Sequence, residues 1–442
     1  MENRTADNGT DAAREKLWSG TFVLVIAATF FCFVVGQGLN SSTSVYVALY
    51  GGTATYAGVL AAAFSAAAAA TRLAAGPLID ERGRRIVAAG GFFVLIVGTA
   101  GPLFTHEVVP FTIFRILQGV GFSAATTALG TAAADVVPTS RMGEGIGYAG
   151  LGQALAMSVG PAFALMLASS DPAENLFWGL CAIGVCGLAL VAACRYEKRP
   201  EVLPATASYR RRREREGAVR GGAADRGEAA DAASAAGRTR DTLVSRVFEK
   251  HALVGAVPLL VMCPAFGFAI FFAGLYGTSL GVASPGAFFT ASAVSMIVVR
   301  IGGATFMDRV APIRLFTTAA ICGILAFATL LACGSGALGQ EAVRDGAFYG
   351  AGFLYGACIG IAMPVNQSIA VKNTPPERWG AANALIQLAN DVGIGTSCIV
   401  WGIVNDTLGF GATICCVMCC IAASVLVARA MYPASGTPAR SR

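Results

Sequence analysis

The sequence has too few charged residues for a soluble protein of its size. Of 442 residues only 13% are charged, whereas 55% are hydrophobic. Soluble globular proteins carry about a quarter charged residues, and a folded chain this long could not cover its surface with half that share. The hydrophobic residues also form blocks long enough for α-helices to cross the ~30 Å hydrocarbon layer of a membrane. The composition therefore predicts a multi-pass protein of the lipid bilayer.

Residue types that catalysis and cofactor binding need are equally scarce. The two histidines, His106 and His251, both fall outside the hydrophobic blocks. No Gly-rich segment ends in the Gly-Lys-Ser/Thr of a nucleotide-binding loop. Nearly all 13 cysteines lie inside hydrophobic blocks, and the cluster at 415–420 has no histidine or acidic residue near it in the sequence, so disulfides and zinc are both disfavoured. We expect no enzyme, no cofactor and no metal.

Twelve hydrophobic segments can be placed, six on each side of a polar stretch. They cover residues 19–39, 54–76, 86–104, 108–134, 143–168, 175–194, 252–276, 285–307, 313–333, 345–371, 379–403 and 408–431. We expect an all-α membrane fold of twelve transmembrane helices. The predicted parts are an N-terminal tail (1–18), a first six-helix bundle (19–194), a linker (195–251), a second six-helix bundle (252–431) and a C-terminal tail (432–442).

The distribution of Lys and Arg supports this count of helices. If the N-terminus is cytoplasmic and the spans alternate, 30 of the 32 Lys and Arg fall on the cytoplasmic side; Arg344 falls outside and Arg115 lies within a span. Positive residues accumulate on the cytoplasmic side of membrane proteins. We therefore expect a plasma (cytoplasmic) membrane protein of bacterial type with both termini in the cytoplasm.

The linker carries most of the net charge. Residues 195–251 hold 14 Lys and Arg and 9 Asp and Glu, with few large apolar residues. Such a segment cannot bury a core and is predicted to be largely disordered. The excess of basic residues in this linker is explained by the positive-inside rule, which sets the orientation of the spans. We therefore expect no nucleic-acid partner.

The two halves of the chain repeat. Residues 72–80 and 300–308 each begin with Arg and end with Asp, at an offset of 228 residues. Residues 138–143 match 375–380 at an offset of 237 through a shared Pro, Arg and Gly. Two similar six-helix halves of parallel topology predict a pseudo-two-fold axis along the membrane normal, the arrangement of alternating-access transporters.

Three motifs resemble signatures of the major facilitator superfamily. Gly76-Pro-Leu-Ile-Asp80-Glu-Arg82-Gly83-Arg84-Arg85 is similar to its loop between the second and third helices. Arg115-Ile-Leu-Gln118-Gly119-Val-Gly121 is similar to its second signature, and Gly160-Pro161 partly matches its antiporter signature, with Ala, Phe and Ala at 162–164 in place of glycines. The resemblance covers the chain except the tails and the linker. It implies two pseudo-symmetric six-helix bundles and, more narrowly, a bacterial efflux-type member similar to drug/proton antiporters.

The first motif marks an expected gate between the bundles. Asp80 ends a span, where a carboxylate can face the positive end of a helix dipole, and the resemblance places that helix end near Trp379–Asn383. It implies that Asp308 makes the equivalent contact at the fifth helix. For Arg84 and Arg85 the alternative is that they merely obey the positive-inside rule. The expected conformational residues are Gly76, Asp80, Arg82, Gly83, Arg84, Arg85, Asp308, Arg309, Gly160 and Pro161.

Five polar residues within the spans are candidates for binding substrate and protons: Arg115, Gln118, Asn366, Gln367 and Asp391. A guanidinium inside a span is costly unless it faces a cavity or a partner. We expect Arg115 to face a cavity; the alternative is a bracket to backbone carbonyls of other helices. Asp391 is the one carboxylate predicted near the midplane, where desolvation favours the protonated form unless a cation is close. The alternative for Asp391 is a structural hydrogen bond.

These features predict a secondary active transporter of a small organic solute, working by alternating access and proton-coupled efflux. Uptake of a metabolite by proton symport is the alternative within transport. An intramembrane enzyme would need a nucleophile–base pair or a metal set inside the spans, and a transporter-like sensor would need an added soluble domain; the sequence favours neither. We expect a monomer whose partners are the solute, protons and lipid.

The predicted orientation can be tested at position 220 of the linker. Arg220→Cys should not react with a membrane-impermeant thiol reagent added to intact cells, because the linker is expected in the cytoplasm. It should react once the cells are permeabilised. The unsubstituted chain measures the background from native cysteines, and labelling of position 220 in intact cells would contradict the orientation.

Overall fold

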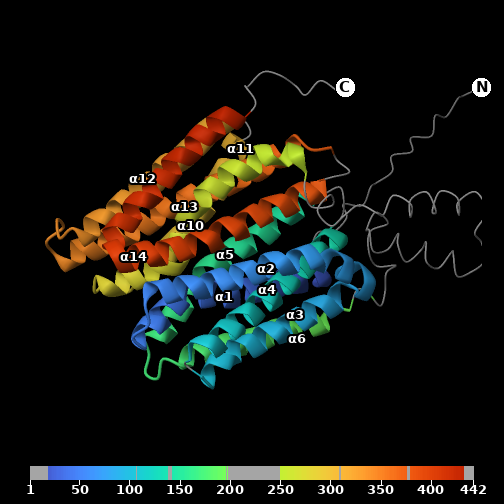
Figure 1. Ribbon diagram of the computed structural model, residues 1–442. Helices are drawn as coiled ribbons and strands as arrows, with labels where there is room; N and C mark the ends of the chain where they lie inside the picture. Colours follow the sequence, from blue (N-terminus) through green and yellow to red (C-terminus); the bar gives the residue numbers. More distant parts are fainter. Residues whose placement is uncertain are drawn as a thin grey trace, which may run out of the picture.

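The computed structural model describes residues 18–105, 107–137, 142–195, 197, 249–307, 310–375 and 379–432. Within these ranges the regular elements are helices (Figure 1). The long ones are α1 (Gly20–Leu49), α2 (Ala54–Arg82), α3 (Arg84–Ala100), α4 (Val108–Val136), α5 (Met142–Ala168), α6 (Asn175–Ala193), α10 (Leu253–Ser279), α11 (Ala287–Met307), α12 (Pro312–Gly334), α13 (Glu341–Lys372) and α14 (Trp379–Met431). Short 3₁₀ turns lie at η1 (Gly101–Leu103) and η6 (Lys250–Ala252).

The α14 helix holds two of the predicted spans. Its backbone is non-helical at Gly409, which adopts φ 82° and ψ 173°. By length and hydropathy, nine helical stretches in the described ranges could cross a membrane, and α14 is one of them. Counting α14 as two, and adding α4 and the shorter apolar stretch of α11, accounts for the twelve predicted segments. Of the predicted linker, only residues 195, 197 and 249–251 are described, so its disorder stays a prediction.

The first helix is longer than the sequence suggests. The predicted span ended at residue 39, before a run of four Ser and Thr, whereas α1 continues to Leu49. The hydroxyl of Ser42 donates to the Gly38 carbonyl (2.7 Å) and that of Thr43 to the Leu39 carbonyl (2.5 Å). Because these hydroxyls bond within their own helix, the polar run stays helical and buried.

The helices build two cores. Buried side chains of α1–α6 form one apolar cluster, and those of α10–α14 form a second. In Figure 1 the first set, blue to green, lies below the second, yellow to red. A few residues of the first half join the second cluster, among them Ala61, Ala154 and Leu165, which shows where the two bundles meet.

Glycines allow α3 and α4 to pack backbone against backbone. A Cβ on Gly121 would lie 2.4 Å from the Leu95 nitrogen and 2.6 Å from the Gly91 carbonyl oxygen. A Cβ on Gly98 would lie 2.9 Å from the Gln118 nitrogen. Small residues let membrane helices approach closely, and here they hold α4 in the position that aims Arg115 and Gln118 at the centre of the bundle.

The contacts between bundles follow the repeat. The main pairs are α2 with α14, α5 with α11 and α1 with α10. The offset of 228 residues carries Gly58 of α2 to Gly286, just before α11. A Cβ on Gly58 would lie 2.3 Å from the Cys398 carbonyl oxygen, and one on Gly286 would lie 3.2 Å from the Cα of Ala162. By the offset of 237, the position equivalent to Cys398 is 161, next to Ala162. The close approach of α2 to α14 at Gly58 is therefore repeated between α11 and α5 at Gly286.

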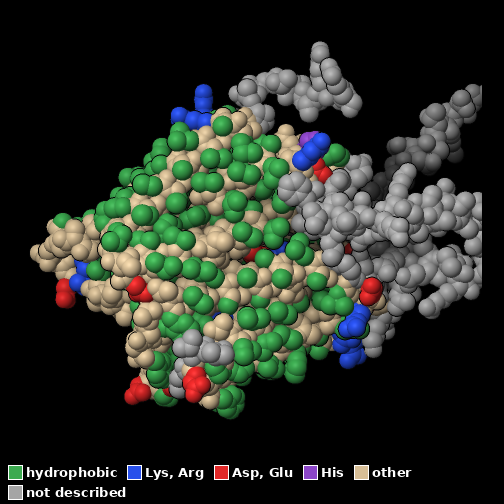
Figure 2. All heavy atoms as spheres, in the orientation of Figure 1, with side chains coloured by type: hydrophobic (Ala, Val, Ile, Leu, Met, Phe, Trp, Pro, Cys, Tyr) green, Lys and Arg blue, Asp and Glu red, His purple; other side chains and the backbone are tan. Residues whose placement is uncertain are grey.

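The surface agrees with a membrane location. Figure 2 shows hydrophobic side chains over the middle of the visible face, with charged side chains mostly toward its ends. Large apolar side chains are exposed on several helices, including Phe93 of α3 and Trp178 of α6, at 62% and 63%. Exposed apolar area on this scale fits contact with lipid.

The glycine packing makes a stability prediction. Gly121→Ala should lower the melting temperature of the purified protein, because its Cβ would collide with backbone atoms of α3 that cannot move aside. Gly90→Ala is the matched control: Gly90 lies in α3 with no atom within 4 Å of the added Cβ, so stability should hold or rise slightly. Equal melting temperatures for the two variants would contradict the packing described.

Candidate functional site

Arg115 lies fully enclosed within the first bundle. Its Nε donates to the Leu60 carbonyl oxygen of α2 (3.2 Å), Nη1 to Gln118 Oε1 (2.8 Å) and Nη2 to Asn40 Oδ1 of α1 (2.9 Å). The guanidinium also lies 4.7 Å from the ring centroid of Phe64. Its relative exposure is 0%, so four neutral partners compensate the charge in place of water.

Gln118 extends this cluster to a fourth helix. Its Nε2 donates to the Gly98 carbonyl oxygen of α3 (2.9 Å), and its exposure is also 0%. Arg115 and Gln118 thus tie α1, α2, α3 and α4 together. The expectation that they line an open cavity is corrected for this conformation: their polar atoms bond to neighbouring helices, as in the bracket alternative.

Asp391 pairs with an arginine of the opposite bundle. Arg72 Nε of α2 lies 3.0 Å from Asp391 Oδ2 of α14, and the two side chains are 15% and 18% exposed. Asp391 is twelve residues from the start of α14, ~18 Å along the helix. Among ion pairs between described residues, this one joins the two bundles. The cation that the sequence left open for Asp391 is therefore Arg72.

The amides of the tenth span are in different surroundings. Asn366 is fully buried, with Nδ2 donating to the Ala362 carbonyl oxygen (2.8 Å) and Oδ1 accepting from the Tyr432 hydroxyl (3.0 Å). Burial raises the pKa of Tyr432, so this hydroxyl stays a donor. These contacts make Asn366 a packing residue here. Gln367 is exposed and donates to Asn383 Oδ1 of α14 (3.0 Å), and its role in binding a solute stays a prediction.

The loop after α2 is built around Gly83 and Arg84. Gly83 has φ +93°, a conformation that favours glycine, and it both ends α2 and precedes α3. Arg84 Nε donates to Asp135 Oδ2 near the end of α4 (2.9 Å), and both side chains are 4% exposed. Arg84 is therefore a buried link between α3 and α4 and does more than satisfy the positive-inside rule.

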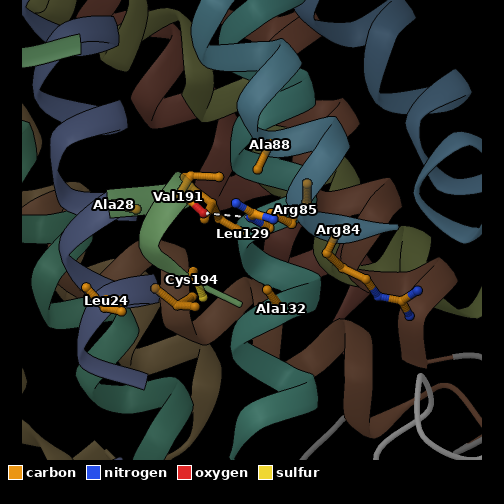
Figure 3. A pocket seen from close by; sticks show the side chains of 11 residues that line it. Leu24, Ala28, Arg84, Arg85, Ala88, Leu129, Ala132, Val191 and Cys194 are labelled. Carbon is orange, nitrogen blue, oxygen red and sulfur yellow. Dashed lines mark hydrogen bonds between the residues drawn. The ribbon is translucent and has the colours of Figure 1, made fainter. Parts of the chain in front are cut away.

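Arg85 binds the end of α6. Its Nη2 donates to the Ala192 carbonyl oxygen (2.6 Å) and its Nε to the Val191 carbonyl oxygen (3.4 Å). The backbone N–H of Arg85 donates to Glu197 (3.1 Å), as does that of Arg84. In Figure 3 Arg85 turns toward Val191 at a small, mostly apolar pocket, while Arg84 extends away. This pocket lies inside the first bundle and away from the contact between bundles.

The remaining gate residues are only partly described. Gly76 and Asp80 belong to α2, and Arg82 is exposed in its last turn. The surroundings of the Asp80 side chain lie outside the described part, as do Asp308 and Arg309 entirely. Their contacts with helix ends stay predictions.

Gly160, with Pro161 after it in α5, lies where α5 crosses α1. A Cβ on Gly160 would lie 2.6 Å from the Val34 carbonyl oxygen and 3.1 Å from the Gly38 nitrogen. The residue thus allows a close crossing of two helices.

Comparison with known proteins decides the family. The family model described as "Major Facilitator Superfamily" matches residues 17–396. The chain belongs to the major facilitator superfamily. It is 26% identical over 182 residues to an uncharacterized MFS-type transporter of Methanocaldococcus jannaschii, a match that covers 41% of this chain and 46% of that protein.

Solved structures share the fold of this major facilitator protein. A variant of nucleoside transporter NupG has a TM-score of 0.69 at 10% identity, covering 93% of this chain and all of that one. Peptide transporter POT with sulfate has 0.68 at 13% identity, covering 93% and 96%. The D-xylose-proton symporter has 0.68 at 16% identity, covering 93% and 98%. At these identities the likeness shows the fold alone.

Membership in the superfamily settles the class of activity. The chain is a multi-pass membrane transporter of the secondary type, in a superfamily whose members act on small molecules and are generally not enzymes. Within the described ranges no group of three His, Cys, Asp or Glu is placed to hold a metal ion. The described cysteines are free thiols, and those at 415, 416 and 419 are exposed on α14.

The sequence did not show how the polar residues of this major facilitator protein pair. Arg72 served only as a marker of the repeat, and its partner Asp391 is 319 residues away. Asn40 lies one residue beyond the predicted first span and was not a candidate, yet from α1 it accepts a hydrogen bond from Arg115. One signal was available: Arg72 and Arg300 lie inside the predicted segments 54–76 and 285–307, and an arginine inside a span needs a partner.

The enclosed position of Arg115 makes a second stability prediction. Arg115→Ala would leave the acceptors on Leu60, Gln118 and Asn40 without their donor, at about 1–3 kcal/mol for each buried group left unpaired. The purified variant should therefore melt at a clearly lower temperature, and Arg115→Lys should lose less. An Arg115→Ala protein that keeps the wild-type melting temperature but loses solute binding would instead make Arg115 a solute ligand.

Proposed function

We propose that this transporter exports a small organic solute in exchange for protons and that Asp391 carries the proton. The protein would lie in the plasma membrane with both termini in the cytoplasm and would act as a monomer. The observation that carries the proposal is the ion pair between Arg72 and Asp391, which joins the two bundles. Alternating access moves one bundle against the other, so contacts between the bundles must form and break during the cycle.

Protonation changes this contact directly. When Asp391 is ionised, it neutralises Arg72 in a partly buried position. When it takes up a proton, Arg72 loses its counter-charge and the attraction between α2 and α14 falls. Removing one partner of a buried ion pair costs about 3–5 kcal/mol, and partial exposure of this pair reduces that figure. Even a part of it is enough to shift a balance between two conformations.

The opposite end of the bundles is held by other contacts. Asp406 of α14 accepts from the backbone nitrogens of Ala54 (3.0 Å) and Thr55 (2.6 Å) at the start of α2. The Ser44 hydroxyl of α1 donates to the Phe271 carbonyl of α10. These contacts lie at the predicted outer end. They fit a conformation closed to the outside, with Asp391 ionised and paired, that loads solute from the cytoplasm.

The exchange cycle then follows from charge. In the outward-open state the pair is separated, and Asp391 takes a proton from the more acidic outer solution as the solute leaves. On return, the proton passes to the cytoplasm and the Arg72–Asp391 pair forms again. Each cycle thus moves protons inward and solute outward.

Asp391→Asn tests this role. In proteoliposomes, with a solute chosen by thermal stabilisation of the purified protein, the variant should lose accumulation driven by a pH gradient. It should keep exchange down the solute gradient, because only the proton step is lost. Asp345→Asn is the matched control: Asp345 pairs with its neighbour Arg344 near the predicted outer end, so coupling should persist.

Two outcomes would overturn the proposal. If Asp391→Asn keeps full gradient-driven accumulation, Asp391 is a structural residue and protons bind elsewhere. If an imposed gradient moves protons and solute in the same direction in the wild type, the protein is a symporter, which corresponds to uptake.

A further inference from the structure

Arg300 of α11 is a partly buried arginine for which no described residue supplies a counter-charge. It lies seven residues before the end of α11 at Met307, ~10 Å along the helix. Within the described part of the chain it makes no ion pair, and its Nε is buried without a hydrogen-bond partner. A guanidinium at such a depth is expected to face a partner or an aqueous path.

The repeat shows what is missing. The offset of 228 residues carries Arg72 to Arg300, and the offset of 237 carries Asp391 to Ala154 of α5. Ala154 is 1% exposed and packs with the core of the second bundle, so it faces the contact between the bundles. The Arg72–Asp391 pair therefore has a counterpart in which the arginine is kept and the carboxylate is replaced by a methyl group.

The α5 face opposite Arg300 leaves room for the guanidinium. A Cβ on Gly150 would lie 2.9 Å from Arg300 Nη1. Gly150 and Ala154 are four residues apart and so lie on one face of α5. Because both residues are small, the Arg300 guanidinium fits between the two bundles. Neither position supplies an acidic side chain to pair with it.

We propose that Arg300 binds an anionic group of the transported solute, a carboxylate or a phosphate, in place of the missing side-chain carboxylate. The guanidinium offers planar, paired donors that match such oxyanions. The substrate class would be small organic anions. This inference deepens the proposed export function and rests on the protein being a transporter, but not on which residue carries the proton.

The experiment measures binding at fixed pH without any gradient. The melting temperature of the purified protein in lipid-free detergent is recorded with benzoate, succinate and inorganic phosphate, and with uncharged benzamide. At least one anion should raise it in a saturable way, and benzamide should not. The rise should vanish in Arg300→Gln and persist, reduced, in Arg300→Lys.

Ala154→Asp supplies the missing carboxylate. If Arg300 then pairs within the protein as Arg72 does, the anion-induced rise should vanish although the charge on Arg300 remains. Ala154→Asn, of the same size and uncharged, should keep it. Arg314→Gln, which removes an exposed arginine at the start of α12, should also keep it.

The proposal is overturned if no anion stabilises the wild type, if benzamide matches benzoate, or if Arg300→Gln keeps the full rise. Stabilisation only by vesicles containing phosphatidylglycerol, abolished in Arg300→Gln, would assign the site to a lipid headgroup and overturn the solute assignment. Loss of proton coupling in Asp391→Asn with intact anion binding separates this inference from the coupling proposal.

Discussion

A positive charge inside the bilayer has to be compensated, and three arginines of the described helices meet this constraint in different ways. Arg115 is surrounded by neutral oxygens and an aromatic ring within one bundle. Arg72 is paired with a carboxylate across the two bundles. Arg300 has no counter-charge among the described residues. The surroundings of Arg115 suit a fixed structural role, and the pair of Arg72 suits a contact that forms and breaks. The surroundings of Arg300 suit a site that binds a ligand.

The internal repeat allows Arg72 and Arg300 to be compared at equivalent positions of the two halves. Two halves with the same topology place arginines at equivalent points of the α2–α14 and α5–α11 contacts. Packing obeys the symmetry, since Gly58 and Gly286 serve the same close approach. The charges do not follow the symmetry, because the position equivalent to Asp391 in the first half is occupied by Ala154. A symmetric scaffold with asymmetric charge allows one contact to respond to protons and the other to respond to solute.

Much of the fold could be predicted from the sequence because membranes impose simple rules. Hydrophobic length and the positive-inside rule located the spans, and the repeat fixed their pairing in two bundles. The errors have local causes: hydroxyls that bond their own helix extend α1 past residue 39. The polar sites were harder, because a charged residue in a span signals a need for a partner without naming it. Arg115 looked like a cavity residue until its acceptors on α1, α2 and its own helix α4 were visible. Asp391 looked unpaired until the fold brought Arg72 beside it.

The central claim is that the charge on Asp391, paired with Arg72, holds the two bundles in the conformation that is closed to the outside. The most direct measurement is the distance between spin labels at Ile86 of α3 and Arg314 of α12, both exposed near the predicted cytoplasmic ends, in a background with the 13 native cysteines replaced. The account predicts a long distance at neutral pH, when the pair is formed and the cytoplasmic side is open, and a shorter distance on acidification, when the pair is broken. In Asp391→Asn the short distance should be present at both pH values. A wild-type distance that ignores pH, or an Asp391→Asn protein that responds to pH as the wild type does, would contradict it.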